Sequence, residues 1–192
     1  MLSRRHVIIL TSAAIGVASH SPIAYSGCRT PRAPSMWIDG PPEYLPGAPL
    51  RNSLLEGERG GDRVRLFGTV MTAECDAVAG ARLDFWHTDS NGKYDDRGFR
   101  FRGAQYSGRH GDYVLDTQMP GPYNGPRHVH FLVAVRLANQ LQPRMFSGAV
   151  FLPTQQEYAD AKPSDRVPEF LSPDSLRTVG GTLLAPCDIV LA

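Results

Sequence analysis

Short segments in which apolar and polar side chains alternate restrict the fold of this chain more than any other feature of its sequence. In residues 63–70, Arg-Val-Arg-Leu-Phe-Gly-Thr-Val, every second residue is Val, Leu or Gly. A period of two places those residues on one face of a β-strand. The same pattern, or a short apolar run, predicts further strands at residues 81–87, 111–117, 128–135, 148–152 and 187–191.

Gly and Pro interrupt these segments frequently. The 192 residues include 19 glycines and 16 prolines, a share above the average for globular proteins. Only Gln155–Ala161 has the pattern of a helix, and it is short. Short strands that recur at regular intervals between Gly/Pro turns predict an all-β fold, specifically a β-sandwich with long loops.

The charge balance excludes one broad class of partner. The chain has 20 Lys and Arg residues against 19 Asp and Glu residues, a net charge of +1. A protein without a basic excess has little means of neutralising phosphates, so we expect no nucleic acid partner. Hydrophobic residues at 42% and charged residues at 20% are typical of an ordinary globular protein.

Residues 1–20 have the pattern of an export signal. Arg4 and Arg5 precede an apolar run over residues 7–18 that contains no acidic side chain and is too short to span a bilayer. The arginine pair is similar to a twin-arginine signal, and a general secretory signal or an uncleaved anchor are the alternatives. We expect export to the periplasm or the extracellular space, with no membrane span after removal of the signal.

A leader rich in Pro, Gly and Ser follows over residues 21–52, and residues 53–192 form the predicted domain. Pairs such as Pro41-Pro42 favour an extended chain that wraps around the domain without regular structure of its own. Such a leader is long enough to reach a neighbouring subunit, so a monomer and a homo-oligomer both stay open.

The three cysteines are Cys28, Cys75 and Cys187. None has the spacing of a zinc or redox motif, and an exported protein can form disulfides. Cys75 and Cys187 lie in the predicted domain, whereas Cys28 lies in the leader. We therefore predict a Cys75–Cys187 disulfide, with Cys28 as the odd thiol.

Residues with metal-binding chemistry gather near the ends of predicted strands. One strand runs into a loop that ends at Tyr94, and a later Pro/Gly-rich loop presents Tyr123 before a strand that starts with His128 and His130. Side chains at i and i+2 of a strand point to the same face, so both imidazoles can bind one metal ion. Neutral imidazole suits zinc, copper and iron alike, so the pair does not select the metal.

Further motifs accompany these residues in order along the chain. The stretches are residues 40–51 (Gly-Pro-Pro-Glu-Tyr-Leu-Pro-Gly-Ala-Pro-Leu-Arg), 68–70, 80–86, 91–94, 102–103, 111–113, 120–123, 128–130 and 187–191. Together they resemble the intradiol ring-cleavage dioxygenases, the family of catechol 1,2- and protocatechuate 3,4-dioxygenases. The main resemblance runs from Pro42 to Val135, and residues 187–191 are similar to the family's closing strand.

The resemblance implies a mononuclear, non-haem ferric iron, Fe(III), held by Tyr94, Tyr123, His128 and His130, with water or hydroxide completing its shell. Phenolates are hard anionic donors that favour ferric iron, and a bound metal lowers the phenol pKa below its free value of about 10. The resemblance also implies that a catechol binds as a dianion, while Tyr123 leaves the metal and helps remove a substrate proton. O2 then cuts the ring between its two hydroxylated carbons to give a muconate-type product.

Two positions depart from the family pattern. The family usually has an arginine a few residues before the first histidine, where this chain has Gly125 and Pro126 and places Arg127 directly before His128. Arg127 is the candidate replacement as a catalytic residue, although adjacent strand residues point to opposite faces. The family often has Gln or Glu near the next strand, where Gly148 stands here. The alternative function is therefore a non-catalytic sandwich of the same family that binds a metal or another ligand.

Overall fold

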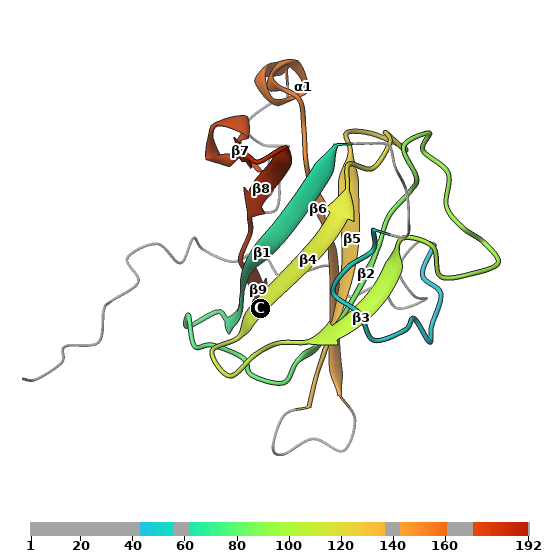
Figure 1. The fold of residues 1–192 in the computed structure, drawn as a ribbon. Helices are drawn as coiled ribbons and strands as arrows, with labels where there is room; N and C mark the ends of the chain where they lie inside the picture. The colour runs from blue at the N-terminus through green and yellow to red at the C-terminus, as the bar shows by residue number, and fades with distance from the viewer. Residues whose placement is uncertain (1–42, 56–61, 137–142, 161–170, 192) are drawn as a thin grey trace, which may run out of the picture.

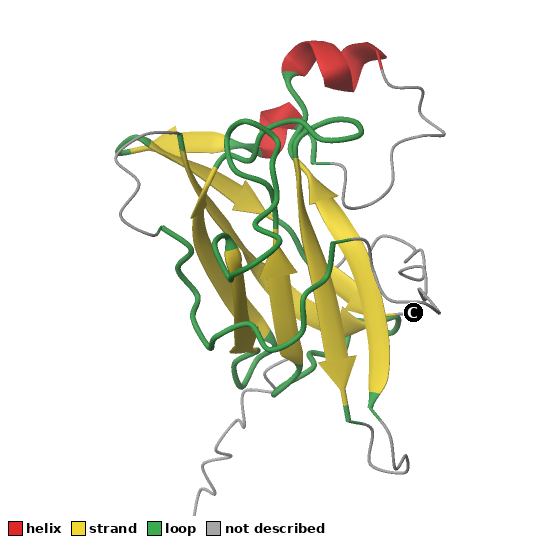
Figure 2. Cartoon of the chain, turned by 90° about the vertical axis from the view of Figure 1, so that its right-hand side faces the viewer, coloured by secondary structure: helices red, strands yellow, loops and turns green. Residues whose placement is uncertain are grey.

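The computed structural model describes residues 43–55, 62–136, 143–160 and 171–191. In these ranges the chain forms two β-sheets packed on one another with very little helix (Figures 1 and 2). This architecture confirms the predicted all-β sandwich. The α-helix of the described part, α1 (Gln155–Asp160), and a short 3-10 helix, η2 (Pro173–Ser175), lie at one end of the sandwich.

The first sheet is built around β1 (Arg63–Thr72). Its strand order is β4 (Asp112–Gln118), β1, β8 (Thr182–Pro186) and β7 (Arg177–Val179), and β9 (Ile189–Leu191) continues the pairing along β1. β1 pairs antiparallel with β4 and parallel with both β8 and β9. Because β8 and β9 pair with successive parts of β1, a corner at Cys187 and Asp188 separates the two strands.

The second sheet is antiparallel throughout. Its strand order is β3 (Arg102–Tyr106), β2 (Arg82–Trp86), β5 (His128–Val135) and β6 (Arg144–Phe151). The register places Trp86 of β2 opposite His130 of β5, and Phe151 of β6 opposite His128. Two aromatic side chains therefore flank the two histidines.

The alternation of residues along β5 separates a core face from an outer face. Val129, Phe131 and Val133 are fully buried and join the hydrophobic core between the sheets. His128 and His130 occupy the intervening positions, and so they lie on the opposite face of the strand. The period of two thus keeps the imidazoles out of the core and presents them to the loops outside the second sheet.

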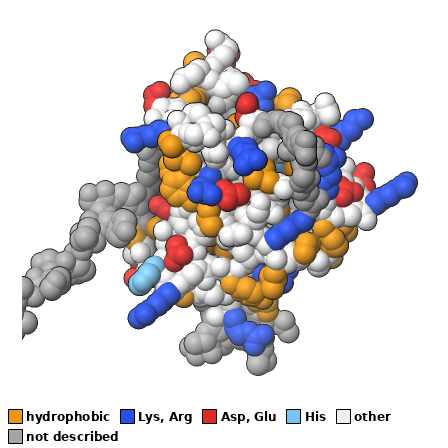
Figure 3. Space-filling view, in the orientation of Figure 1, with side chains coloured by type: hydrophobic (Ala, Val, Ile, Leu, Met, Phe, Trp, Pro, Cys, Tyr) orange, Lys and Arg blue, Asp and Glu red, His pale blue; other side chains and the backbone are white. Residues whose placement is uncertain are grey.

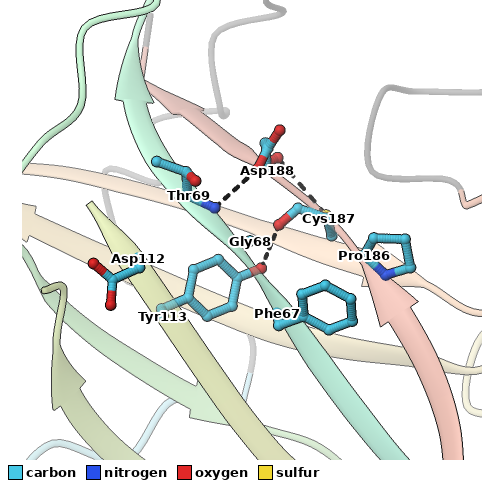
Figure 4. A pocket seen from close by; sticks show the side chains of 8 residues that line it. All are labelled: Phe67, Gly68, Thr69, Asp112, Tyr113, Pro186, Cys187 and Asp188. Carbon is cyan, nitrogen blue, oxygen red and sulfur yellow. Dashed lines mark hydrogen bonds between the residues drawn. The ribbon is translucent and has the colours of Figure 1, made fainter. Parts of the chain in front are cut away.

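The corner between β8 and β9 requires a glycine on β1. A Cβ atom on Gly68 would lie 1.9 Å from the carbonyl oxygen of Cys187, so no larger residue fits there. The hydroxyl of Tyr113 donates to that oxygen at 2.7 Å, and the Thr69 N–H donates to Asp188 Oδ1 at 2.8 Å (Figure 4). A hollow of about 430 Å³ opens beside this corner, and it contains none of the predicted metal ligands.

Charged side chains of both signs intermingle on the face shown in Figure 3. The described residues include ion pairs such as that between Arg65 Nε and Asp116 Oδ1 at 2.6 Å. In the described ranges, no helix has the length and apolar character needed to cross a membrane. The predicted export signal, most of the predicted leader and Cys28 lie outside the described residues.

Most of the predicted strands and the predicted helix are confirmed. The predictions at 63–70, 81–87, 111–117 and 128–135 correspond to β1, β2, β4 and β5, and the helix predicted at 155–161 corresponds to α1. β6 starts four residues earlier than predicted, at Arg144, and β9 covers only the end of the segment predicted at 187–191. Three strands, β3, β7 and β8, escaped prediction because their short sequences lack a clear alternation.

The predicted Cys75–Cys187 disulfide is wrong. Cys187 is a buried, reduced cysteine, while Cys75 forms a disulfide that does not involve it. The backbone explains why the pair does not meet. The Cys187 N–H donates to Phe67 O near the middle of β1, whereas Cys75 follows the end of that strand at Thr72. Five strand residues separate these points by roughly 16 Å, well beyond the Cα separation that a disulfide spans.

Candidate metal centre

His128 and His130 direct their Nε2 atoms at one another across 3.1 Å. The Nδ1 atom of His128 lies 2.8 Å from the carbonyl oxygen of Pro126. A carbonyl only accepts hydrogen bonds, so Nδ1 carries a proton and Nε2 is the ring nitrogen that faces His130. Two nitrogens that bind one metal ion at about 2.1 Å and at roughly right angles would be about 3 Å apart, and the observed separation fits this arrangement.

The environment of His130 keeps its ring neutral. The ring stacks on the indole of Trp86, with centroids 5.1 Å apart and planes inclined by 12°. Burial lowers the pKa of His130 to about 3, and the charges of His128, Arg102 and His87 act in the same direction. The imidazole is therefore unprotonated over the ordinary pH range, which is the form that binds metals.

Tyr94 brings a phenol oxygen to the same place. Its hydroxyl is buried and has no hydrogen-bond partner among the described residues. A buried hydroxyl without a partner is costly and rare, so its position indicates a missing ligand. Burial raises the pKa of Tyr94, the Glu43 carboxylate and Tyr123 raise it further, and Arg102 opposes them. Without a metal ion at its oxygen, this phenol stays protonated, because the effect of Arg102 does not outweigh burial.

Tyr123 meets Tyr94 from the solvent side. The two rings pack edge to face with centroids 5.1 Å apart. The Tyr123 ring is half-buried, and its hydroxyl donates a long hydrogen bond of 3.4 Å to Glu43 Oε1. The two phenols therefore differ in environment, since the oxygen of Tyr94 is enclosed and that of Tyr123 can reach solvent and a carboxylate.

Backbone hydrogen bonds hold the two tyrosine loops together. The Gly121 N–H donates to Asp89 O at 2.8 Å, and the Thr88 hydroxyl donates to Gly121 O at 3.1 Å. The Asp89 carboxylate accepts from the N–H groups of Asn91 and Lys93, which fixes the turn that leads to Tyr94. The loop after β2 and the loop after β4 thus form one rigid unit over the outer face of the second sheet.

Arg102 links this unit to the N-terminal segment. Its guanidinium is almost fully buried, at 3% exposure, and lies 5.8 Å from the centre of the Tyr94 ring. Nη1 donates to Glu43 O at 2.6 Å, while Nε and Nη2 donate to Asp95 O at 3.3 and 3.1 Å. Sequence reasoning matched Arg102 to a motif but gave it no role, because the strand that begins at Arg102 was itself not predicted.

Glu43 and Tyr44 extend the site into the predicted leader. The Tyr44 ring packs against Trp86 with centroids 5.2 Å apart, and the Glu43 carboxylate accepts a hydrogen bond from the Tyr123 hydroxyl. Sequence reasoning missed Glu43 because its partner lies 80 positions away, and nothing in the local sequence marks such a contact.

The two departures from the family pattern have different outcomes. Arg127 lies half-buried just before β5, with its carbonyl bonded to the Leu152 N–H at 2.7 Å. Within the described ranges, no hydrogen bond or ion pair joins its guanidinium to the four predicted ligands, and its role stays a prediction.

Gly148 faces the core, because it pairs with Phe131 and its Cβ would lie 2.6 Å from that ring. A longer side chain at this position would not point to the histidines.

The donor set fits a metal ion of high charge. No three His, Cys, Asp or Glu side chains of the described residues gather as a metal site, so a metal held here needs the tyrosine oxygens as well as the histidine nitrogens. Two phenolates and two neutral imidazoles are a mixed set of hard and intermediate donors. Tyr94, Tyr123 and His128 each lie in ring contact with a neighbouring predicted ligand, so the structure brings all four together.

Known proteins resemble this chain in sequence and in fold. The model of a family described as Dioxygenase matches residues 38–159. Catechol 1,2-dioxygenase 1 of Acinetobacter lwoffii is 31% identical over 142 residues, which are 58% of this chain and 44% of that relative. The chain thus spans less than half the length of this curated relative.

Two solved structures show the same fold. The dioxygenase domain of a dioxygenase carbohydrate-binding protein fusion from Streptomyces sp. SirexAA-E is 27% identical, with a TM-score of 0.64 and coverage of 83% of this chain and 98% of that one. The 3-chlorocatechol 1,2-dioxygenase from Rhodococcus opacus 1CP has a TM-score of 0.62 at 20% identity, with coverage of 80% and 70%. The second likeness carries weight for the fold alone.

Proposed function

The chain belongs to the dioxygenase family whose model spans residues 38–159, and we propose on that premise that it is an intradiol dioxygenase acting on a catechol-type aromatic. The reaction uses O2 to cut the ring between its two hydroxylated carbons and gives a muconate-type product. The observation that carries the proposal is the convergence of Tyr94, Tyr123, His128 and His130 outside the second sheet.

We infer that the resident metal is a single non-haem ferric ion. The partnerless hydroxyl of Tyr94, the close approach of the two histidine Nε2 atoms and the neutral ring of His130 all support this assignment. A bound ferric ion would supply a Lewis acid that draws a catechol dianion toward reaction with O2. Phenolate donors suit a ferric ion because both are hard and oppositely charged.

The two tyrosines have separate tasks in this proposal. Tyr94 is enclosed and held by its loop, so it stays in place through the reaction. Tyr123 is half-buried with room to move, so it gives way to the substrate and takes a hydroxyl proton at its own phenol oxygen. Trp86 is buried between neighbours that include the rings of His130 and Tyr44, so it holds the His130 imidazole in place.

Arg127 is proposed as the cation that stabilises negative charge on the substrate ring, in the place of the arginine that the family carries nearby. Its position immediately before His128 supports this role, because a short movement of a long side chain brings the guanidinium to the outer face of β5. An Arg127→Gln variant should bind catechol and iron while turning over more slowly. Unchanged turnover would remove Arg127 from the mechanism.

The test of the proposed function combines metal analysis, absorption and oxygen uptake. Protein loaded with ferric iron should be red-brown, because tyrosinate-to-iron charge transfer absorbs visible light, and should consume O2 when catechol is added. His128→Ala and His130→Ala variants should lose iron. A protein that stays colourless with iron and air contradicts the dioxygenase proposal. Colour and catechol binding without oxygen uptake would favour the non-catalytic alternative.

We also propose that the chain is exported, by the twin-arginine route. Arg4 and Arg5 before an acid-free apolar run support this, and a disulfide at Cys75 is compatible with an oxidising compartment. Replacing Arg4 and Arg5 by lysines should leave the protein in the cytoplasm, as measured by cell fractionation. Continued export of that variant would point to another route.

A further inference from the structure

We propose that Glu43 is a specificity-determining residue that makes the site favour catechols with a positively charged substituent over catechols with an anionic one. The inference rests on the proposed function and concerns the charge of the substituent, not the reaction itself.

The position of Glu43 places its carboxylate at the border of the substrate site. Oε1 lies 3.4 Å from the hydroxyl of Tyr123, the phenol that is proposed to give way when a catechol binds. A substrate that takes the place of this phenol therefore comes within a few ångströms of the carboxylate. The two hydroxyls of a catechol would bind at the metal site. A substituent on the other side of the ring then points outward, toward the exposed rim to which Glu43 belongs.

The backbone around Glu43 is held on both sides. Arg102 Nη1 donates to the Glu43 carbonyl at 2.6 Å, and the ring of the next residue, Tyr44, packs against Trp86. Glu43 itself has a φ of 56°, a conformation that a non-glycine residue adopts only when its surroundings impose it. The main chain therefore fixes the point from which the Glu43 side chain starts, within reach of the Tyr123 hydroxyl.

The guanidinium that is bonded to the main chain of Glu43 does not pair with the Glu43 carboxylate. Arg102 lies buried against the Tyr94 ring, and its donors are directed at the main-chain carbonyls of Glu43 and Asp95. Among the described residues, Glu43 forms no ion pair. The fixed charge at the mouth is thus negative.

The experiment compares three catechols that differ only in a substituent set off from the ring by one methylene group. They are 3,4-dihydroxybenzylamine, which is cationic, 3,4-dihydroxybenzyl alcohol, which is neutral, and 3,4-dihydroxyphenylacetate, which is anionic. Dissociation constants are measured by calorimetry on the iron-loaded protein without O2, so the readout is binding and not turnover. Catechol with O2 is measured in parallel to test the proposed function.

Glu43→Gln removes the charge while keeping the size of the side chain and an oxygen that can accept from Tyr123. We compare each charged probe with the neutral probe in the same protein. On this scale, we expect the variant to bind the cation about fivefold more weakly and the anion about fivefold more tightly than the wild type does. This is the effect of unit charges about 7 Å apart in a partly hydrated site. In about 1 M salt both differences should shrink, because exposed charges are then screened within about 3 Å. Glu43→Lys should reverse the order of the charged probes.

Glu74→Gln is the matched control, since Glu74 is an exposed carboxylate in the turn after β1, and it should leave all three constants unchanged. The inference is overturned if the dissociation constants of the charged probes, each divided by that of the neutral probe, are the same in wild type and Glu43→Gln. This holds even when catechol is bound and oxidised. Failure of every probe and of catechol to bind or react contradicts the proposed function instead. A purely structural role of Glu43 would change all three constants by the same factor, which also overturns the inference.

Discussion

Gly92 and Gly121 are packed so closely that a Cβ atom on Gly121 would lie 2.3 Å from the backbone nitrogen of Gly92. Each glycine belongs to a loop that carries one tyrosine of the site. The approach of the two backbones is what brings the rings of Tyr94 and Tyr123 to a centroid distance of 5.1 Å. The tyrosine pair therefore depends on two residues that have no side chain.

Gly121→Ala should separate the two tyrosine loops. The added methyl group meets backbone atoms of Gly92 and Ser90, which cannot rotate away, so we expect a loss of about 1–3 kcal/mol in the free energy of unfolding together with reduced iron occupancy. Chemical denaturation and metal analysis measure the two effects. Asn91→Ala, at an exposed position of the loop that contains Gly92, is the control and should retain iron. Full iron occupancy in Gly121→Ala would show that loop contact is not needed for the site.

Arg102→Lys tests whether the guanidinium positions Tyr94. Lysine keeps the charge but cannot bridge the carbonyls of Glu43 and Asp95, since it lacks the planar fork of donors. We expect a destabilisation of about 2 kcal/mol and a shift of the tyrosinate absorption band as the Tyr94 loop relaxes. The control is Arg97→Lys, an exposed arginine of that loop. An unchanged band would leave Arg102 with a role in stability alone.

His87 should make the protein less stable in mild acid. The ring is buried between Thr117 Oγ1 at 2.6 Å and Thr88 O at 2.7 Å, and burial lowers its pKa to about 4. The unfolded chain binds a proton at a pKa of about 6.5, so it holds more protons than the folded chain between these values. Stability is then complete above about pH 6.5 and falls as the pH drops toward 4, by up to about 3 kcal/mol from this group.

Urea denaturation of the wild type and of His87→Gln across this range measures the effect. The stability of the variant should depend less steeply on pH, because glutamine does not titrate. Equal slopes in the two proteins would mean that His87 is accessible to protons in the folded state.

The two tyrosines should respond differently to removal of their hydroxyl groups. Tyr123→Phe should retain iron and lose most of its turnover, because the substrate proton then has no phenolate to accept it. Tyr94→Phe should weaken the visible band and the iron affinity, since it deletes the enclosed oxygen. Iron analysis, absorption spectra and oxygen uptake distinguish the two variants. Wild-type turnover by Tyr123→Phe would contradict its assignment as the mobile ligand.

The sandwich, the family and the pairing of His128 with His130 on one strand face could be predicted from the sequence, because each depends on a local pattern. A period of two places alternate residues on one face whatever the rest of the chain does. β3 and β8 were not predicted, because Arg102-Gly103 and Pro186 weaken the strand pattern in segments of only five residues. Their place in the sheets is set by partners far along the chain.

Contacts between distant residues were the part that local reasoning could not reach. The disulfide prediction failed because the distance between Cys75 and Cys187 depends on where β8 meets β1. Glu43 lies in a segment whose composition predicts only an extended leader, and its contact with Tyr123 joins residues 80 positions apart. Both the disulfide and the Glu43–Tyr123 contact depend on burial and long-range pairing, and neither property can be recognised in the neighbouring residues of the sequence.

The two faces of β5 separate the demands of folding from those of chemistry. The side chains of Val129, Phe131 and Val133 fill the interior, while those of His128 and His130 lie on the outer face of the strand. Substitution of a histidine therefore leaves the interior filled, and a change of interior volume leaves both imidazoles in register. One eight-residue strand thus holds two sets of positions that can vary independently during evolution, so the reactive centre can be remodelled by point substitution on a scaffold that stays intact.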